Sequence, residues 1–249
     1  MKYSRIIIAS FLSMFVIKAL AYDFAIENAD GVTIYYNYIS NGKELEVTYK
    51  NNSYNSYNGS VVIPEEVTYM NRTRKVTSIG SGAFSNCSSL TSISIPNSVT
   101  IIKERAFGEC FNLTSVTIPN SVTIIEKFAF TYCTGLTSVV LGTNLKSIGE
   151  WAFQSCRNIV SLTIPDSVND IEEAAFFSCE GLTTVTIGNG VTSIGNQAFY
   201  GCKNIVSLTI GSNVATIGEK AFLGCGKLSS VNIPNSVTDI KKEAFSGCI

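Results

Sequence analysis

The sequence of 249 residues contains no histidine. Imidazole is the commonest general base in enzymes and a frequent zinc ligand, because its pKa lies close to neutrality. The absence therefore excludes Ser-His-Asp and Cys-His catalytic arrangements and zinc sites that use histidine. Charge is scarce as well: Lys, Arg, Asp and Glu make up 15% of the chain, and the net charge is −1. Without a basic block, no contact with nucleic acid or an anionic membrane is predicted.

Other signatures of chemistry are also missing. The sequence has no C-x-x-C pair, no Gly-rich phosphate loop and no dinucleotide-binding fingerprint. Its carboxylates are scattered, and pairs such as Glu65-Glu66 and Glu172-Glu173 are interpreted as solvated charges. Glycoside hydrolysis would need two carboxylates that converge in a cleft. We therefore predict no enzyme, no catalytic residues, no cofactor and no metal, with a secreted hydrolase as a remote alternative.

The first 21 residues have the pattern of a secretory signal peptide. Lys2 and Arg5 precede a mostly apolar run over residues 6–20, and Ala19-Leu20-Ala21 fits a small-x-small cleavage site. A membrane anchor is the alternative, but the run is short for a spanning helix and is interrupted by serines and a lysine. The pattern predicts a protein that is secreted or held at the cell surface.

What the sequence has in abundance is repetition. The motif Ala-Phe-x-x-Cys occurs eight times at steps of 23 residues, from Ala83-Phe84 to Ala244-Phe245, and contains all eight cysteines. Before each motif, stretches such as Leu-Thr-Ser-Val-Thr-Ile alternate apolar and polar residues, which predicts a short half-buried strand. Pro-Asn-Ser then predicts a turn, and the segment through Ala-Phe-x-x-Cys fits one helical or 3₁₀ turn.

One such repeat cannot bury its own apolar side, but stacked repeats can. The predicted fold is an α/β repeat solenoid, a leucine-rich-repeat right-handed coil with one short parallel strand and one short helical or 3₁₀ turn per repeat. It extends over residues 61–249 with an irregular first repeat, in which residues 68–75 form an excursion. Residues 22–60 precede it. Apolar alternation over residues 32–39 and 44–49, around Asn41-Gly42, predicts a β-hairpin N-terminal cap followed by a polar loop.

The repeat unit resembles the Treponema-type leucine-rich repeat of the BspA-like surface proteins. The resemblance rests on residues 113–119, Leu-Thr-Ser-Val-Thr-Ile-Pro, followed by Val122, Ile125 and Ala129-Phe130-Cys133, and it covers residues 76–249. It implies surface display and protein–protein contact, including adhesion to host matrix proteins or to another cell's surface. The alternative is a scaffold segment of a longer surface solenoid with no ligand of its own, since the chain stops at Ile249 without a C-terminal cap. The oligomeric state is not predicted.

Eight cysteines in a secreted chain are compatible with four disulfides. Stacked cysteines lie within reach of one another, but their side chains point the same way, whereas a disulfide needs converging Cβ vectors. We therefore favour small core residues with free thiols.

Two sets of residues are candidates for contact with a partner. The first is the outward side of the strands, which in leucine-rich repeats commonly binds partners, although short polar side chains also simply solvate a strand. Its candidates are Ser115, Thr117, Ser138, Val140, Ser161, Thr163, Thr186 and Thr209. The second set is aromatic, at positions that are small or polar in other repeats, and such residues carry much of the binding energy of interfaces. These candidates are Tyr132, Trp151, Phe177 and Tyr200, with Phe111 and Phe128 beside them. The alternative is that they pack between neighbouring turns.

Overall fold

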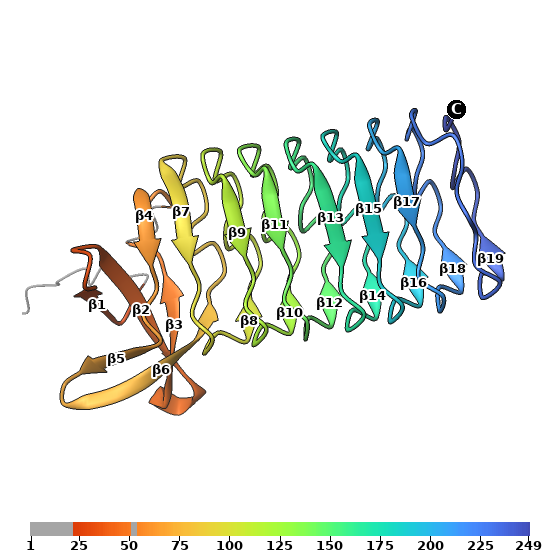
Figure 1. Ribbon diagram of the computed structural model, residues 1–249. Coiled ribbons are helices and arrows are strands. Elements are labelled where there is room, and N and C mark those ends of the chain that lie inside the picture. Colours follow the sequence, from red (N-terminus) through yellow and green to blue (C-terminus); the bar gives the residue numbers. More distant parts are fainter. Residues whose placement is uncertain (1–21, 51–53) are drawn as a thin grey trace, which may run out of the picture.

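The computed structural model describes residues 22–50 and 54–249. The coils follow one another in sequence order along an elongated body, with the N-terminal strands at one end and the C-terminus at the other (Figure 1). The predicted signal peptide, residues 1–21, lies outside the described residues, and so does part of the predicted loop, residues 51–53. No helix in the described part is long and apolar enough to cross a membrane.

Each regular coil except the last begins with a strand from the alternating stretch. Apolar residues such as Val116 point inward and are buried, while the Ser and Thr residues between them point outward, as the period of two requires. Equivalent residues of successive coils pair in parallel, for example Ser115 with Ser138. The longer strands are β7 (Leu90–Ser94), β9 (Ser115–Thr117), β11 (Ser138–Val140), β13 (Ser161–Ile164), β15 (Thr184–Ile187) and β17 (Ser207–Thr209).

A second sheet forms the next side of the coil. After the turn at Pro-Asn-Ser, each repeat contributes two residues that pair in parallel with their equivalents in the neighbouring coils. These strands are β8 (Ile101–Ile102), β10 (Ile124–Ile125), β12 (Ser147–Ile148), β14 (Asp170–Ile171), β16 (Ser193–Ile194), β18 (Thr216–Ile217) and β19 (Asp239–Ile240).

The prediction of a helical or 3₁₀ turn in each repeat is wrong for the described coils. In the coil of residues 104–110, the Arg105, Phe107 and Glu109 amides donate to carbonyls of the next coil, and the amide that follows each of them donates three residues back. Arg105 and Glu109 also have positive φ angles, 53° and 63°. A helix needs every amide for its own carbonyls and right-handed φ throughout. The segment is therefore a run of turns that forms a third parallel hydrogen-bonded side, here called the turn face.

The predicted N-terminal hairpin is confirmed. β2 (Thr33–Ile39) pairs antiparallel with β3 (Glu44–Thr48) across the 3₁₀ helix η1 (Ser40–Gly42), and β1 (Phe24–Glu27) pairs with β2. β3 joins the second sheet by pairing in parallel with β6 (Arg72–Ile79), and β4 (Gly59–Val62) pairs with β7. The predicted excursion is an antiparallel pair of β5 (Glu66–Tyr69) with β6. That this sheet serves as a cap stays a prediction.

One column of rings runs through the core. The phenylalanines of the Ala-Phe-x-x-Cys motifs stack nearly parallel, with ring centroids 4.9 Å apart at Phe84–Phe107 and 5.2 Å apart at Phe222–Phe245. At the N-terminal end the buried Tyr57 ring lies 4.4 Å from Phe84, and its hydroxyl donates to the carbonyl of Thr48 at 2.5 Å. Tyr57 therefore continues the column and ties it to the N-terminal hairpin.

Candidate partner-binding surfaces

The outward side of the longer strands, here called the strand face, brings eight of the predicted residues together. Thr186 is half-buried, and the other seven, from Ser115 to Thr209, are exposed. The register stacks them in two columns, with Ser115 beside Ser138 and Thr163 beside Thr186. Val140 interrupts the second column with a side chain that is 53% exposed. That this face contacts a partner stays a prediction.

The strand face offers little chemical variety. Its two outward columns hold Ser or Thr at almost every coil, and the column before them, which includes Thr114, Thr137 and Thr183, uses its hydroxyls internally. The Thr137 hydroxyl, for example, donates to the carbonyl of Thr114 in the preceding coil at 3.1 Å. A uniform row of small neutral groups can contact many surfaces but distinguishes few of them.

Three of the four predicted aromatic residues meet on the turn face. Trp151 lies between Phe128 and Phe177, with ring centroids 6.5 Å and 5.3 Å away, and Phe177 stacks on Tyr200 at 4.7 Å. All four rings are half-buried, so they pack on one another and still present surface to solvent. We call Phe128, Trp151, Phe177 and Tyr200 the aromatic row. The fourth predicted aromatic, Tyr132, is 41% exposed and has no ring contact among the described residues.

Sequence reasoning missed Arg105. Its guanidinium lies over the Phe128 ring, 4.8 Å from the centroid, and so continues the aromatic row by one coil toward the N-terminus. A stacked guanidinium of this kind is a favourable cation–π contact. The signal was available, because Arg105, Phe128 and Trp151 occupy the same position of successive repeats.

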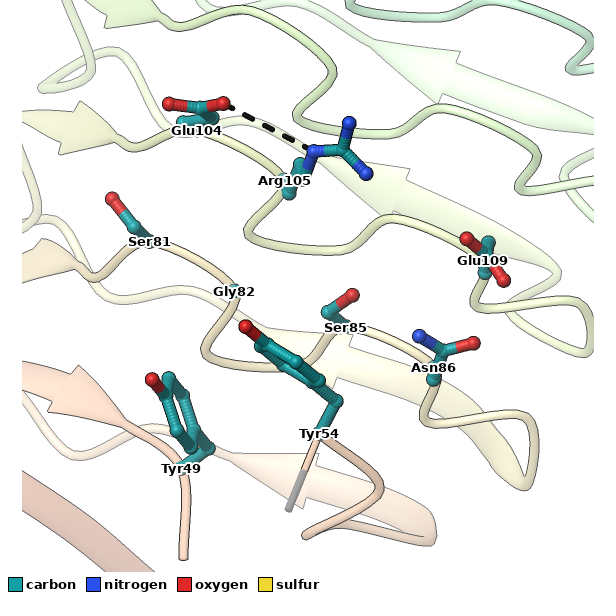
Figure 2. A pocket seen from close by; sticks show the side chains of 9 residues that line it. All are labelled: Tyr49, Tyr54, Ser81, Gly82, Ser85, Asn86, Glu104, Arg105 and Glu109. Carbon is teal, nitrogen blue, oxygen red and sulfur yellow. Dashed lines mark ion pairs between the residues drawn. The ribbon is translucent and has the colours of Figure 1, made fainter. Parts of the chain in front are cut away.

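Next to Arg105 the turn face is hollowed. The hollow has a volume of about 400 Å³ and lies between the chain before β4 and the first two coils (Figure 2). Tyr49 and Tyr54 line one side, and the residues opposite them come from the turn segments. Its lining consists of Tyr49, Tyr54, Ser81, Gly82, Ser85, Asn86, Glu104, Arg105 and Glu109.

The cysteines are free, as predicted, and all but Cys248 are buried. From Cys110 onward each thiol donates to the carbonyl of a core phenylalanine, as Cys110 does to Phe84 at a sulfur–oxygen distance of 3.0 Å. Burial raises the pKa of Cys179 to about 12, because the low-dielectric core penalises the thiolate. Reactivity needs the thiolate, so these thiols are structural. Among the described residues, no group of three His, Cys, Asp or Glu side chains could hold a metal ion.

The repeat also matches a family model. The model describes a BspA type leucine rich repeat region in six copies, and it matches residues 60–183 and 126–249. The chain belongs to the BspA-type leucine-rich-repeat family. The family is one of surface proteins whose repeats suggest a protein-binding or scaffold role.

Solved structures of leucine-rich-repeat proteins share the fold of this chain. A leucine-rich-repeat protein of T. pallidum is 28% identical, with a TM-score of 0.70 over 78% of this chain and 87% of that one. A leucine-rich-repeat protein of Eubacterium ventriosum shares the fold at 22% identity, with a TM-score of 0.54 over 84% of this chain and 51% of that one. No curated protein matches the chain. On this BspA-type solenoid, the strand face and the turn face hold the predicted partner-binding residues.

Proposed function

We propose that this chain is a non-catalytic protein-binding module that acts outside the cell, in adhesion to a matrix protein or to another cell's surface. The aromatic row carries the proposal. Trp, Tyr and Arg side chains dominate the energetics of protein interfaces, because they bring a large rigid apolar area and a polar end together. Trp151, Tyr200 and Arg105 lie along one face within a few coils of one another.

Secretion is part of this proposal and rests on the sequence of residues 1–21. The positive start, the apolar run and Ala19-Leu20-Ala21 are typical of an exported protein. The lack of histidine in the whole sequence supports a role without acid–base catalysis. The strand-face residues are the second choice for the contact, because their side chains are short and nearly identical from coil to coil.

A capture experiment with immobilised matrix proteins tests the proposal. We expect the purified protein to be retained by at least one of them, and we expect Trp151→Ala and Tyr200→Ala to lose most of the retained fraction. Met70→Ala is the control, since Met70 is 78% exposed at the tip between β5 and β6, away from both surfaces. Retention that both aromatic substitutions leave unchanged would argue against the aromatic row as the binding surface.

A further inference from the structure

The hollow beside Arg105 is built differently from the rest of the turn face. Two tyrosine rings wall it, with the centroids of Tyr49 and Tyr54 5.2 Å apart and the planes inclined by 43°. Tyr54 is 50% exposed, so its ring presents surface to the hollow and to solvent (Figure 2). None of the four rings of the aromatic row lines it.

Gly82 explains why the hollow forms at the first coil. It occupies the position that holds Arg105, Phe128 and Trp151 in the coils that follow. A Cβ atom at Gly82 would lie 2.9 Å from Cε1 of Tyr54, which is closer than ordinary contact. The missing side chain lets the Tyr54 ring lie directly against the backbone. Its φ of +65° also suits glycine, because only glycine adopts this conformation without a steric cost.

The polar side chains around the rings have unused hydrogen-bonding capacity. Within the described residues, the side chains of Ser81, Asn86 and Glu109 make no hydrogen bond and no ion pair. An amide supplies both donor and acceptor atoms, and a carboxylate accepts several hydrogen bonds. A ligand in the hollow could therefore satisfy several polar groups at once.

The charges of the hollow nearly cancel. Glu104 and Arg105 approach to 4.0 Å, and Lys127 of the next coil lies 3.6 Å from the other Glu104 oxygen. The lining itself holds two carboxylates, Glu104 and Glu109, and one cation, Arg105, while Lys127 neutralises Glu104 from outside the lining. Neither a cationic side chain nor an anion would gain much from this balance. A neutral ligand with many hydroxyl groups fits it better.

We propose that the hollow binds a neutral sugar at the end of a glycan. One side of a pyranose ring presents C–H groups and packs flat on an aromatic ring, as Tyr54 offers, while the hydroxyls at its rim reach Asn86 and Glu109. The volume of about 400 Å³ lies within the range of small-molecule sites. This proposal is separate from the protein-binding function, because the hollow shares Arg105 with that surface but none of its four aromatic residues.

An array of glycans tests it. The probes are oligosaccharides that end in galactose, glucose, N-acetylglucosamine or N-acetylgalactosamine, with sialylated and sulfated glycans and a lysine-rich peptide alongside. We expect the protein to be retained by at least one class of neutral terminus, and free monosaccharide of that class to compete. Tyr54→Ala should weaken retention by about tenfold or more, and Glu109→Ala by several-fold.

Two variants make the outcome decisive. Gly82→Ala forces the Tyr54 ring to move and should reduce retention, whereas Met70→Ala, an exposed residue of the same half of the molecule, should bind as the parent does. Thermal unfolding of each variant separates lost binding from lost folding. The proposal is overturned if no neutral glycan is retained, if Tyr54→Ala binds equally well, or if only anionic glycans or the lysine-rich peptide are retained. If the protein binds a matrix protein but no glycan on the array, the protein-binding function is supported and the sugar-binding proposal is wrong.

Discussion

The strand face and the turn face come from the same repeat, yet they differ in how freely their residues vary. The first outward column of the strand face is Ser or Thr in every regular coil. The first left-handed column of the turn face changes character at each coil. It reads Gly82, Arg105, Phe128, Trp151, Ala174, Gln197, Lys220 and Glu243. The turn face is therefore where this solenoid differs from coil to coil.

Backbone geometry gives the physical reason. On the strand face, the extended backbone favours β-branched residues, and most outward positions hold compact Ser or Thr. On the turn face the left-handed conformation penalises any residue with a Cβ atom by about 1–2 kcal/mol. Since nearly all of that cost arises at Cβ, the atoms beyond it are free to vary. Specific recognition can evolve there without a further penalty to the fold.

The largest predicted effect is unfolding at alkaline pH, which would disrupt the strand face and the turn face together. The cause is ionisation of the buried cysteine thiols in the core beneath them. Burial raises the pKa of Cys87 to about 11 and of Cys179 and Cys225 to about 12, against about 8.5 in an unfolded chain. A folded pKa above the unfolded one means that stability is complete below pH 8.5 and is lost as the pH rises toward 11–12. Three such thiols would lower the free energy of unfolding by about 4 kcal/mol per pH unit in that window.

Urea unfolding between pH 8 and pH 11 measures this loss, and Cys179→Ala is the control. The substitution removes one buried thiol and therefore one proton from the difference between the folded and unfolded states. The free energy of unfolding should then fall less steeply with pH, by about 1.4 kcal/mol per pH unit. An unchanged slope would mean that other groups cause the alkaline unfolding. Thiol titration at neutral pH adds a second check, because slow reaction in the native state and eight reactive thiols after denaturation are expected.

The second prediction separates the core from the turn face within one coil. Phe153 is fully buried, with its ring 5.0 Å from Phe130 and 5.2 Å from Phe176. Phe153→Ala leaves a cavity in the middle of the stack and should reduce the free energy of unfolding by about 3–5 kcal/mol. Trp151→Ala, two residues away, removes a half-buried ring and should cost about 1 kcal/mol. Equal losses in denaturant unfolding would show that the aromatic row is a structural element of the core.

The sequence predicted the structure of the strand face more fully than that of the turn face. Alternation alone identified the strands, and Asn41-Gly42 identified the hairpin, because both patterns reflect local geometry. The turn segments were mistaken for helix because their left-handed positions hold Arg105, Phe128 and Trp151, whose conformation no composition reveals. Glycines in the same columns, such as Gly82 and Gly201, were the available signal.

The sequence also did not predict contacts between residues that occupy different positions of the repeat. Trp151 meets Phe177, which lies three positions further along its own repeat, so the 23-residue register does not place the two rings together. The hollow depends on Tyr54 packing against Gly82, two residues from different parts of the chain. Such contacts follow from the pitch of the coil and from the path of the N-terminal chain, and a repeat pattern contains neither.

The third prediction asks which face holds the partner. Trp151→Ala should weaken binding to a captured matrix protein by about 2 kcal/mol, or roughly thirtyfold, since central aromatic residues are typical hot spots. Ser138→Arg places a large charged side chain in the middle of the strand face, where Ser138 is exposed between β9 and β13. It should change affinity by less than about threefold if the partner lies on the turn face. A strong loss with Ser138→Arg and none with Trp151→Ala would move the binding site to the strand face.

The smallest predicted effect compares the two faces directly. The same change, Ser to Gly, should raise the free energy of unfolding on the turn face and lower it on the strand face. Ser178 has a φ of 54° on the turn face, in a column where Gly201, Gly224 and Gly247 follow. Ser178→Gly removes the Cβ penalty and should stabilise the fold by about 0.5–1 kcal/mol. Ser161 lies in β13 with extended backbone, so Ser161→Gly should destabilise by about 1 kcal/mol through lost β-propensity and added chain entropy. Urea unfolding of both variants resolves the difference. If both substitutions destabilise equally, the left-handed backbone does not explain why the turn face varies so freely.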